Sequence, residues 1–133
     1  MLNKSPSGSL CPYYYMGGEL HPLKYGSYFN DKESLLSIMK AEEDFILNSS
    51  GRNNRLIWID LYETDLDDNI IDTFVIHLQT ISHKIFKLCL VGCSVKNKRK
   101  ISNCMKTKGF NLAEQVKYFK DAEEAKQWLI GEK

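Results

Sequence analysis

The chain has 133 residues, which is enough for one domain with a two-sided hydrophobic core. Its 43% hydrophobic and 26% charged residues are typical of globular proteins, and its net charge of +1 gives no overall attraction to nucleic acid. No apolar run approaches the ~20 residues that span a bilayer, and the N-terminus lacks a hydrophobic signal core. We therefore expect a cytoplasmic protein with no membrane span and no nucleic-acid partner.

The first ten residues are rich in Ser, Gly, Pro and Lys, which predicts a flexible tail (1–10) followed by a single domain (11–133). Tyr13 to Met16 favours a strand, and Gly17-Gly18 favours a hairpin turn. The return segment, Glu19 to Phe29, is irregular, and Pro22 predicts that it lies at a sheet edge. Five of the seven tyrosines precede residue 29, so they either cover the sheet or form an adhesive face, and an edge hairpin of this kind allows two copies to pair as a homodimer.

A helix is predicted next, because Asn30 and Glu33 have the spacing of a capping box and Gly51 suits a helix end. Its apolar stripe has one polar interruption, Glu42, and otherwise consists of Leu35, Ile38, Met39, Phe45 and Ile46. The nearly continuous apolar run from Leu56 to Leu61 then predicts a central strand.

A second helix follows an acidic loop, and either Asp67 or Asp68 is expected to cap it. Its predicted buried stripe is Ile70, Ile71, Phe74, Val75, Leu78 and Ile81. Ile85 to Val91 predicts another strand, and Ser94 is expected to cap a third helix that runs to Lys108.

Val116 to Phe119 predicts a short last strand, and Asp121 and Glu124 again have capping-box spacing before a final helix. The predicted order is an N-terminal hairpin followed by α, β, α, β, α, β, α. Alternation of this kind predicts an α/β fold with a mainly parallel central sheet flanked by helices.

The cysteines, histidines and acidic residues do not have the spacing of a known metal site, so we predict no metal and no cofactor. The cysteines (Cys11, Cys89, Cys93 and Cys104) lack the spacing of a zinc site and are expected to be free thiols in a reducing compartment. The histidines (His21, His77 and His83) are scattered and are expected to be structural or on the surface. The acidic cluster of Glu63, Asp65, Asp67 and Asp68 suits a hard cation, but it lacks a calcium-loop pattern and favours a solvated loop with one capping acid.

Two further patterns leave alternatives open. Asp60 ends a strand, as the phospho-acceptor of a response-regulator receiver does, but the acidic pair and the lysine of such a site are missing. The basic run Lys96 to Lys100 is either a solvated surface or, with the free amides of a helix N-terminus, an anion site. The sequence has no nucleophile elbow and no glycine-rich phosphate loop, and we predict that the protein is not an enzyme.

Four short segments follow one another within roughly residues 13 to 130: Gly18-Glu19-Leu20, Ile57 to Leu61, Leu90 to Ser94 and Phe119 to Ala125. Together they resemble the STAS domain of anti-sigma factor antagonists (the SpoIIAA-like fold). Gly18-Glu19-Leu20 resembles the "GEL" of an early strand of that family, and Ile57 to Leu61 resembles its "vvlDL" strand. Leu90 to Ser94 resembles its "lvGvs" strand end, and Phe119 to Ala125 resembles its closing "fdsleeAl". The resemblance implies a SpoIIAA-like fold and a role in regulation through protein–protein interaction.

The chain departs from the family at the phosphorylation switch. The family's switch members have Asp-Ser-Ser-Gly at the start of the second helix, whereas this chain has Asp68-Asn69-Ile70-Ile71. Ile70 therefore stands where the resemblance implies a phospho-acceptor serine, and we expect no switch of the usual kind.

We therefore predict a non-catalytic STAS-like module that binds a protein partner through the surface of the second helix. The expected partner-binding residues are Asp67, Asp68, Asn69, Asp72, Thr73 and His77. The alternative is a sensor of a small anionic ligand, such as a nucleotide, at the N-terminus of the third helix. The expected anion-binding residues are Ser94, Lys96, Lys98 and Arg99.

Overall fold

A computed structural model describes residues 3–8, 10–11, 13–15, 18–48, 55–110 and 115–131. Its main sheet has the strand order β3-β4-β5-β6-β7, in which β3 is antiparallel to β4 and the other neighbours are parallel. These strands are β3 (Tyr13–Tyr15), β4 (Gly18–Lys24), β5 (Arg55–Asp60), β6 (Ile85–Val91) and β7 (Lys117–Phe119). The predicted α/β architecture with a mainly parallel sheet is confirmed.

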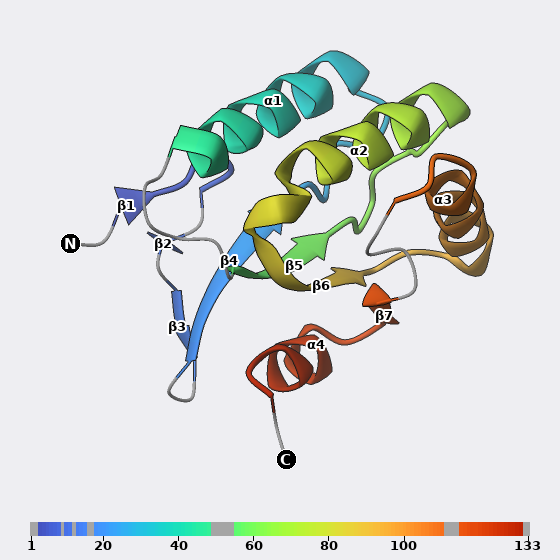
Figure 1. Cartoon of the computed structure of the whole chain (residues 1–133). Coiled ribbons are helices and arrows are strands. Elements are labelled where there is room, and N and C mark those ends of the chain that lie inside the picture. Colours follow the sequence, from blue (N-terminus) through green and yellow to red (C-terminus); the bar gives the residue numbers. More distant parts are fainter. Residues whose placement is uncertain are drawn as a thin grey trace.

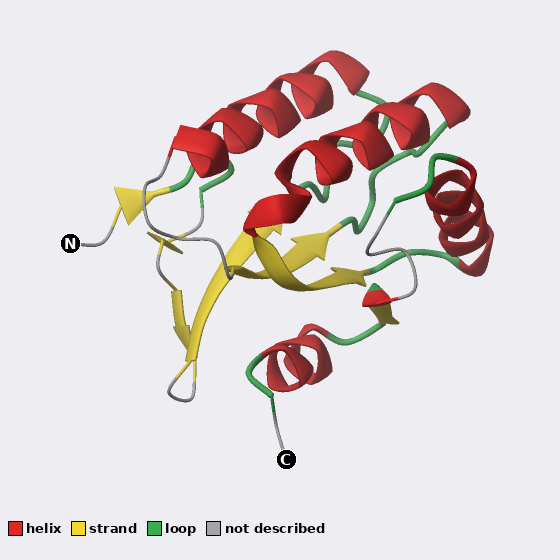
Figure 2. Cartoon of the chain, viewed as in Figure 1, coloured by secondary structure: helices red, strands yellow, loops and turns green. Residues whose placement is uncertain are grey.

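The helices are α1 (Lys32–Asn48), α2 (Asp68–Ile81), α3 (Val95–Thr107) and α4 (Ala122–Leu129), with a short 3-10 turn, η1 (Ser82–Lys84), after α2. The strand order follows the chain order, so right-handed crossovers place α1, α2 and α3 on the same face of the sheet. Figure 1 and Figure 2 show α1 and α2 across this face, α3 at the end near β7, and α4 on the opposite face. Among the described residues, no helix has the length and apolar character needed to cross a bilayer.

The central strand separates two cores because its side chains alternate between the two faces. Ile57 and Ile59 of β5 are fully buried beneath α1, α2 and α3. Leu56 and Trp58 are partly buried and face the smaller core that α4 covers. The predicted stripe of α2 belongs entirely to the larger core, so its assignment is confirmed.

The helix caps follow the predicted chemistry, with one shift. Asp67 caps α2 by accepting a hydrogen bond from the Ile70 N–H at 2.8 Å. Ser94 caps α3, as predicted. The first helix is instead capped by Asp31, whose carboxylate accepts from the Ser34 N–H at 3.2 Å, so the prediction of Asn30 was wrong by one residue.

The N-terminal region is more regular than the sequence pattern predicts. The return strand of the hairpin is regular over β4, and not irregular as predicted. The described pairs join β3 to residues 18–20 of β4 and β5 to residues 21–24, so Pro22 is in register with Trp58 of β5 and lies beyond the described pairs with β3. Residues 3–8, expected to belong to a flexible tail, instead form β1 (Asn3–Lys4), which pairs with β2 (Leu10–Cys11), and a turn with a buried Ser5. The predicted turn glycine Gly17 lies outside the described residues.

The turn is held because the Glu42 carboxylate of α1 accepts hydrogen bonds from it. The Ser5 hydroxyl donates to Glu42 Oε2 at 2.7 Å, and the Ser7 N–H donates to the same oxygen at 2.8 Å. Satisfying a buried carboxylate in this way offsets its desolvation, and it fixes the turn against α1.

Candidate functional site

The predicted protein-binding face of α2 is engaged in ion pairs with neighbouring helices. Asp68 pairs with Lys100 of α3 at 3.1 Å, and Asp72 pairs with Lys108, immediately after α3, at 2.8 Å. Asp67 caps α2 and pairs with Lys32 of α1, and this lysine is the main reason that its pKa lies below the ordinary value. The other exposed residues predicted on this face are Asn69 and Thr73.

His77 was also predicted on this face, and this prediction was wrong. Its side chain is only 3% exposed and lies between Glu43 of α1 and Tyr25, which follows β4. Nδ1 lies 3.1 Å from Glu43 Oε1, and Nε2 lies 2.8 Å from the Tyr25 hydroxyl. Since a carboxylate only accepts, Nδ1 carries the hydrogen and Nε2 accepts from Tyr25, so this histidine is a structural link.

This link predicts a loss of stability at mildly acidic pH. Burial lowers the pKa of His77 below its ordinary value of 6.5, although the Glu43 carboxylate opposes this effect. The unfolded chain therefore binds a proton more readily, and stability falls as the pH drops below 6.5 towards the lower folded value. Urea unfolding at pH 7, 6 and 5 should show a weaker pH dependence for His77→Gln than for the wild type. Equal slopes for the wild type and His77→Gln would contradict the prediction.

The predicted anion site is partly used for local structure. The Ser94 hydroxyl accepts from the Asn97 N–H at 3.1 Å, and the Lys98 ammonium lies 5.2 Å from the centre of the Tyr118 ring. Lys96 and Arg99 are exposed. The residues therefore lie together at the start of α3, but the hydroxyl already serves as the helix cap.

Asp60 and Tyr62 lie at the carboxyl ends of the parallel strands, where α/β proteins commonly bind ligands. The Asp60 carboxylate accepts from the Tyr62 N–H at 3.0 Å, and a Cβ on Gly26 would lie 2.7 Å from its Oδ1. The Tyr62 ring lies against Gly92 at the end of β6, and its hydroxyl donates to the Lys120 carbonyl. In the part of the chain that the structure describes, no three His, Cys, Asp or Glu side chains are grouped to hold a metal.

The described cysteines are free, as predicted, and their surroundings disfavour nucleophilic chemistry. Burial raises the pKa of the Cys89 thiol to about 12 and that of Cys93 to about 12. A thiol with so high a pKa carries almost no thiolate near neutral pH, and the thiolate is the reactive form. The side chain of Cys11 lies outside the described residues.

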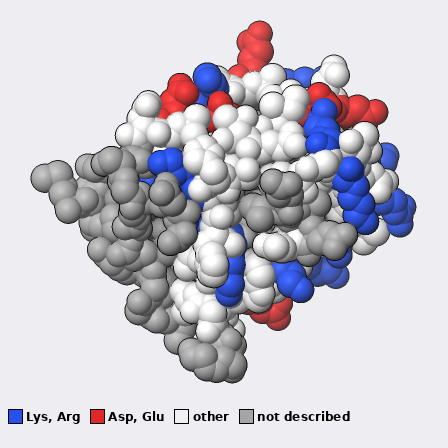
Figure 3. All heavy atoms as spheres, viewed as in Figure 1, with Lys and Arg blue, Asp and Glu red and all other residues white. Residues whose placement is uncertain are grey.

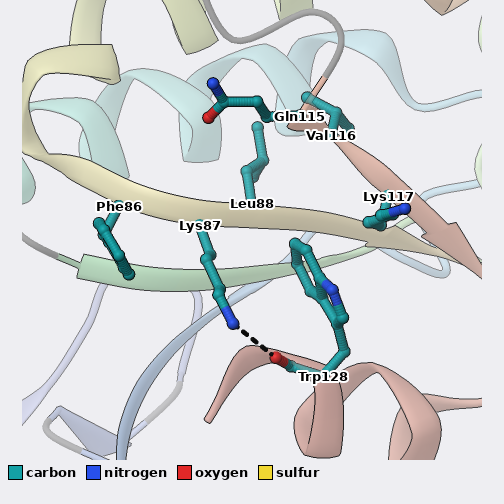
Figure 4. A pocket seen from close by; sticks show the side chains of 7 residues that line it. All are labelled: Phe86, Lys87, Leu88, Gln115, Val116, Lys117 and Trp128. Carbon is teal, nitrogen blue, oxygen red and sulfur yellow. Dashed lines mark hydrogen bonds between the residues drawn. The ribbon is translucent and has the colours of Figure 1, made fainter. Parts of the chain in front are cut away.

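Among the described residues, a groove of about 400 Å³ lies at the β7 side of β6. Ligand pockets usually have ~300–1,000 Å³ and mostly apolar walls. We call this surface the β6 groove. It is lined by Phe86, Lys87, Leu88, Gln115, Val116, Lys117 and Trp128 (Figure 4).

A β-bulge in β6 shapes one end of the groove. In the register with β5, Arg55 is paired with Ile85 and Leu56 with Lys87, so Phe86 is the extra residue. The bulge leaves the Phe86 side chain 59% exposed. Beyond it, β7 pairs only with the last three residues of β6, so the described part of β7 leaves Phe86 uncovered.

The opposite wall is held by a contact between β6 and α4. The Lys87 ammonium donates to the Trp128 carbonyl at 3.0 Å and lies 4.9 Å from the centre of the Trp128 ring. A cation at a helix C-terminus is favourable, so this contact fixes the indole in place. Figure 4 shows Lys87 and Trp128 on one side of β6, with Leu88, Gln115 and Val116 on the other side.

Sequence analysis missed the groove, because it is formed by register and not by a motif. Phe86 lies in a strand that the apolar pattern predicts correctly, but only the pairing with β5 reveals the bulge. The structure places Ile85 and Leu88 in the same core although they are three residues apart. A regular strand would place two such side chains on opposite faces, so only an irregularity in β6 allows this arrangement.

Comparison of the chain with protein-family models, with curated proteins and with solved structures finds no match in any of the three. The role of the groove is therefore argued from its own geometry and chemistry.

Proposed function

We propose that the chain is a non-catalytic interaction module that holds a protein partner in the β6 groove. The observation that carries the proposal is the combination of an exposed aromatic, Phe86, with a fixed indole, Trp128, at one apolar concavity. Interfaces gain most of their binding energy from a few such anchors in well-formed pockets. Rigid walls also lower the entropic cost of binding.

The carboxyl edge of the sheet supports the proposal that the module has no catalytic activity. The strand order β4-β5-β6-β7 follows the chain without reversing, so this part of the sheet has no topological switch point. Tyr62 and Asp60 occupy the space above the strand ends. The buried polar groups described above, at His77 and Glu42, serve hydrogen bonds within the fold.

We further propose that the module is STAS-like. The hairpin and the order of strands and helices agree with what the sequence resemblance implies. Ile70, at the position of the family's acceptor serine, is 1% exposed and packs in the larger core. A buried apolar residue there supports a module that does not use the phosphorylation switch.

The groove is preferred to the two surfaces predicted from sequence, for separate reasons. On α2, Asp68 and Asp72 are neutralised by lysines of the same chain, which weakens their attraction for a partner. On α3, the Ser94 hydroxyl is already used as a cap. No comparable intramolecular contact engages the exposed Phe86 ring among the described residues.

The chain offers a matched pair of variants for the test. Phe86 and Phe29 are 59% and 58% exposed, and they lie on different parts of the molecule. Affinity capture from native lysate, quantified by mass spectrometry, should recover a partner with the wild type and with Phe29→Ser. Phe86→Ser should lose that partner, because a central aromatic anchor contributes at least about 2 kcal/mol, or roughly 30-fold in affinity.

Two further measurements complete the experiment. Circular dichroism and thermal unfolding are measured first, because lost binding reports on the groove only if Phe86→Ser is folded. Asp68→Lys with Asp72→Lys tests the α2 face, and these changes should leave the recovered proteins unchanged. Loss with the α2 variant and retention with Phe86→Ser would place the interaction on α2 and contradict the groove.

A further inference from the structure

The charges of this chain are strongly segregated along the sequence. Of its 18 Lys and Arg residues, ten lie between residues 82 and 120, and this segment has only one of the 17 acidic residues, Glu114. Although the net charge of the chain is near zero, the segment that includes β6, α3 and β7 is therefore basic. Figure 3 shows Lys and Arg gathered on this side of the molecule, with Asp and Glu mainly elsewhere in the view.

Some of these cations serve the fold, and two others line the β6 groove. Lys100 and Lys108 pair with the acids of α2. Lys117, in contrast, lines the groove and is exposed, and Lys87 lines it as well. The apolar concavity is therefore bordered by positive charge.

Lys87 adds a second donor inside the groove. Its ammonium has three N–H donors, and the Trp128 carbonyl accepts one of them at 3.0 Å. The other donors can serve a carboxylate placed between Lys87 and Lys117. A charge-assisted bond of this kind is about twice as strong as a neutral hydrogen bond.

From this arrangement we infer that the partner is an acidic protein segment, with one bulky apolar side chain in the β6 groove and flanking carboxylates near Lys87 and Lys117. The inference rests on the proposed function and specifies the chemistry of its partner. A protein segment fits better than single-stranded nucleic acid, because the Lys87 ammonium already lies over the Trp128 ring where a base would stack.

The test is a selection that does not presuppose a sequence. A random dodecapeptide library displayed on phage is panned on the wild type after depletion on Phe86→Ser. Enriched peptides should have net negative charge and one Leu, Ile, Met, Phe or Trp. Measured by fluorescence anisotropy, Lys117→Glu should weaken the best synthetic peptide about tenfold or more at low salt, and by less at high salt. Lys24→Glu, at an exposed strand lysine of β4, should leave affinity unchanged.

The other outcomes separate the two proposals. Groove-dependent peptides that are neutral or basic would overturn the acidic partner and leave the interaction module intact. If no groove-dependent peptide is enriched and the lysate partners survive Phe86→Ser, both proposals are overturned. A labelled 20-nucleotide oligothymidine that binds the wild type and is lost with Phe86→Ser and Lys117→Glu would identify nucleic acid as the occupant and overturn the acidic segment.

Discussion

Replacing Glu42 with alanine is expected to lower the free energy of unfolding by about 3–5 kcal/mol, the cost of removing one partner from a buried charged cluster. Glu42 is fully buried in α1 and accepts hydrogen bonds from Ser5 and Ser7. Its other oxygen lies 3.4 Å from His21 Nε2. His21 Nδ1 in turn lies 2.9 Å from the Arg55 guanidinium, which only donates, so Nε2 carries the hydrogen that faces Glu42.

The loss should be visible in both urea and thermal unfolding, with a lower Tm by roughly 10–20 °C. Asp44→Ala is the matched control, because Asp44 lies on the same helix, is 54% exposed and pairs with Lys40 at 3.4 Å. This exposed pair is screened by solvent and should contribute little to stability. A similar loss for both variants would show that helix α1, and not the buried cluster, determines the effect.

The pH dependence gives a second signature of Glu42. Burial raises its pKa, but the contact with His21 and the hydrogen bonds from Ser7 and Ser5 together outweigh burial, so the net pKa is lower than the ordinary value of 4.5. Its contribution is therefore complete above pH 4.5 and is lost as the pH falls through the lower folded value. Accordingly, the stability difference between the wild type and Glu42→Gln should shrink below pH 4.5.

The elements that sequence analysis predicts correctly are determined by residues that lie close together in the sequence. The strand before Asp60, the cap at Asp67 and the stripe from Ile70 to Ile81 need only local propensity and helical periodicity, and all are present. The alternation of strands and helices then restricts the sheet to parallel crossovers. The fold class is therefore encoded in short segments.

The polar core and the groove depend on long-range pairing and were not predicted. Glu42 was visible only as an interruption in an apolar stripe, because Ser5 and Ser7, which bind it, lie more than 30 residues away. His77 follows the same rule, since Tyr25 and Glu43 come from other elements. A polar residue on a buried helix face therefore predicts a distant partner, but its sequence position does not identify that partner.

Replacing Gly92 with alanine is expected to lower the free energy of unfolding by roughly 2–5 kcal/mol, as the sum of backbone strain and overpacking. Gly92 has φ +90°, which side chains rarely adopt. A Cβ there would lie 2.8 Å from Cγ and Cδ1 of the Tyr62 ring. The ring would have to leave the ends of β6 and β7 and release its hydrogen bond to the Lys120 carbonyl.

Two comparisons separate strain from the contact with Tyr62. Gly109 also has a positive φ, +69°, but a Cβ there would have no neighbour within 4 Å, so Gly109→Ala should show backbone strain alone and a smaller loss. A double-mutant cycle with Tyr62→Ala, followed by urea unfolding, isolates the steric contribution, because Gly92→Ala should cost less once the ring is absent. If the cost is the same with and without the ring, Tyr62 does not press on Gly92. The carboxyl edge of the sheet would then be less tightly filled than the non-catalytic proposal requires.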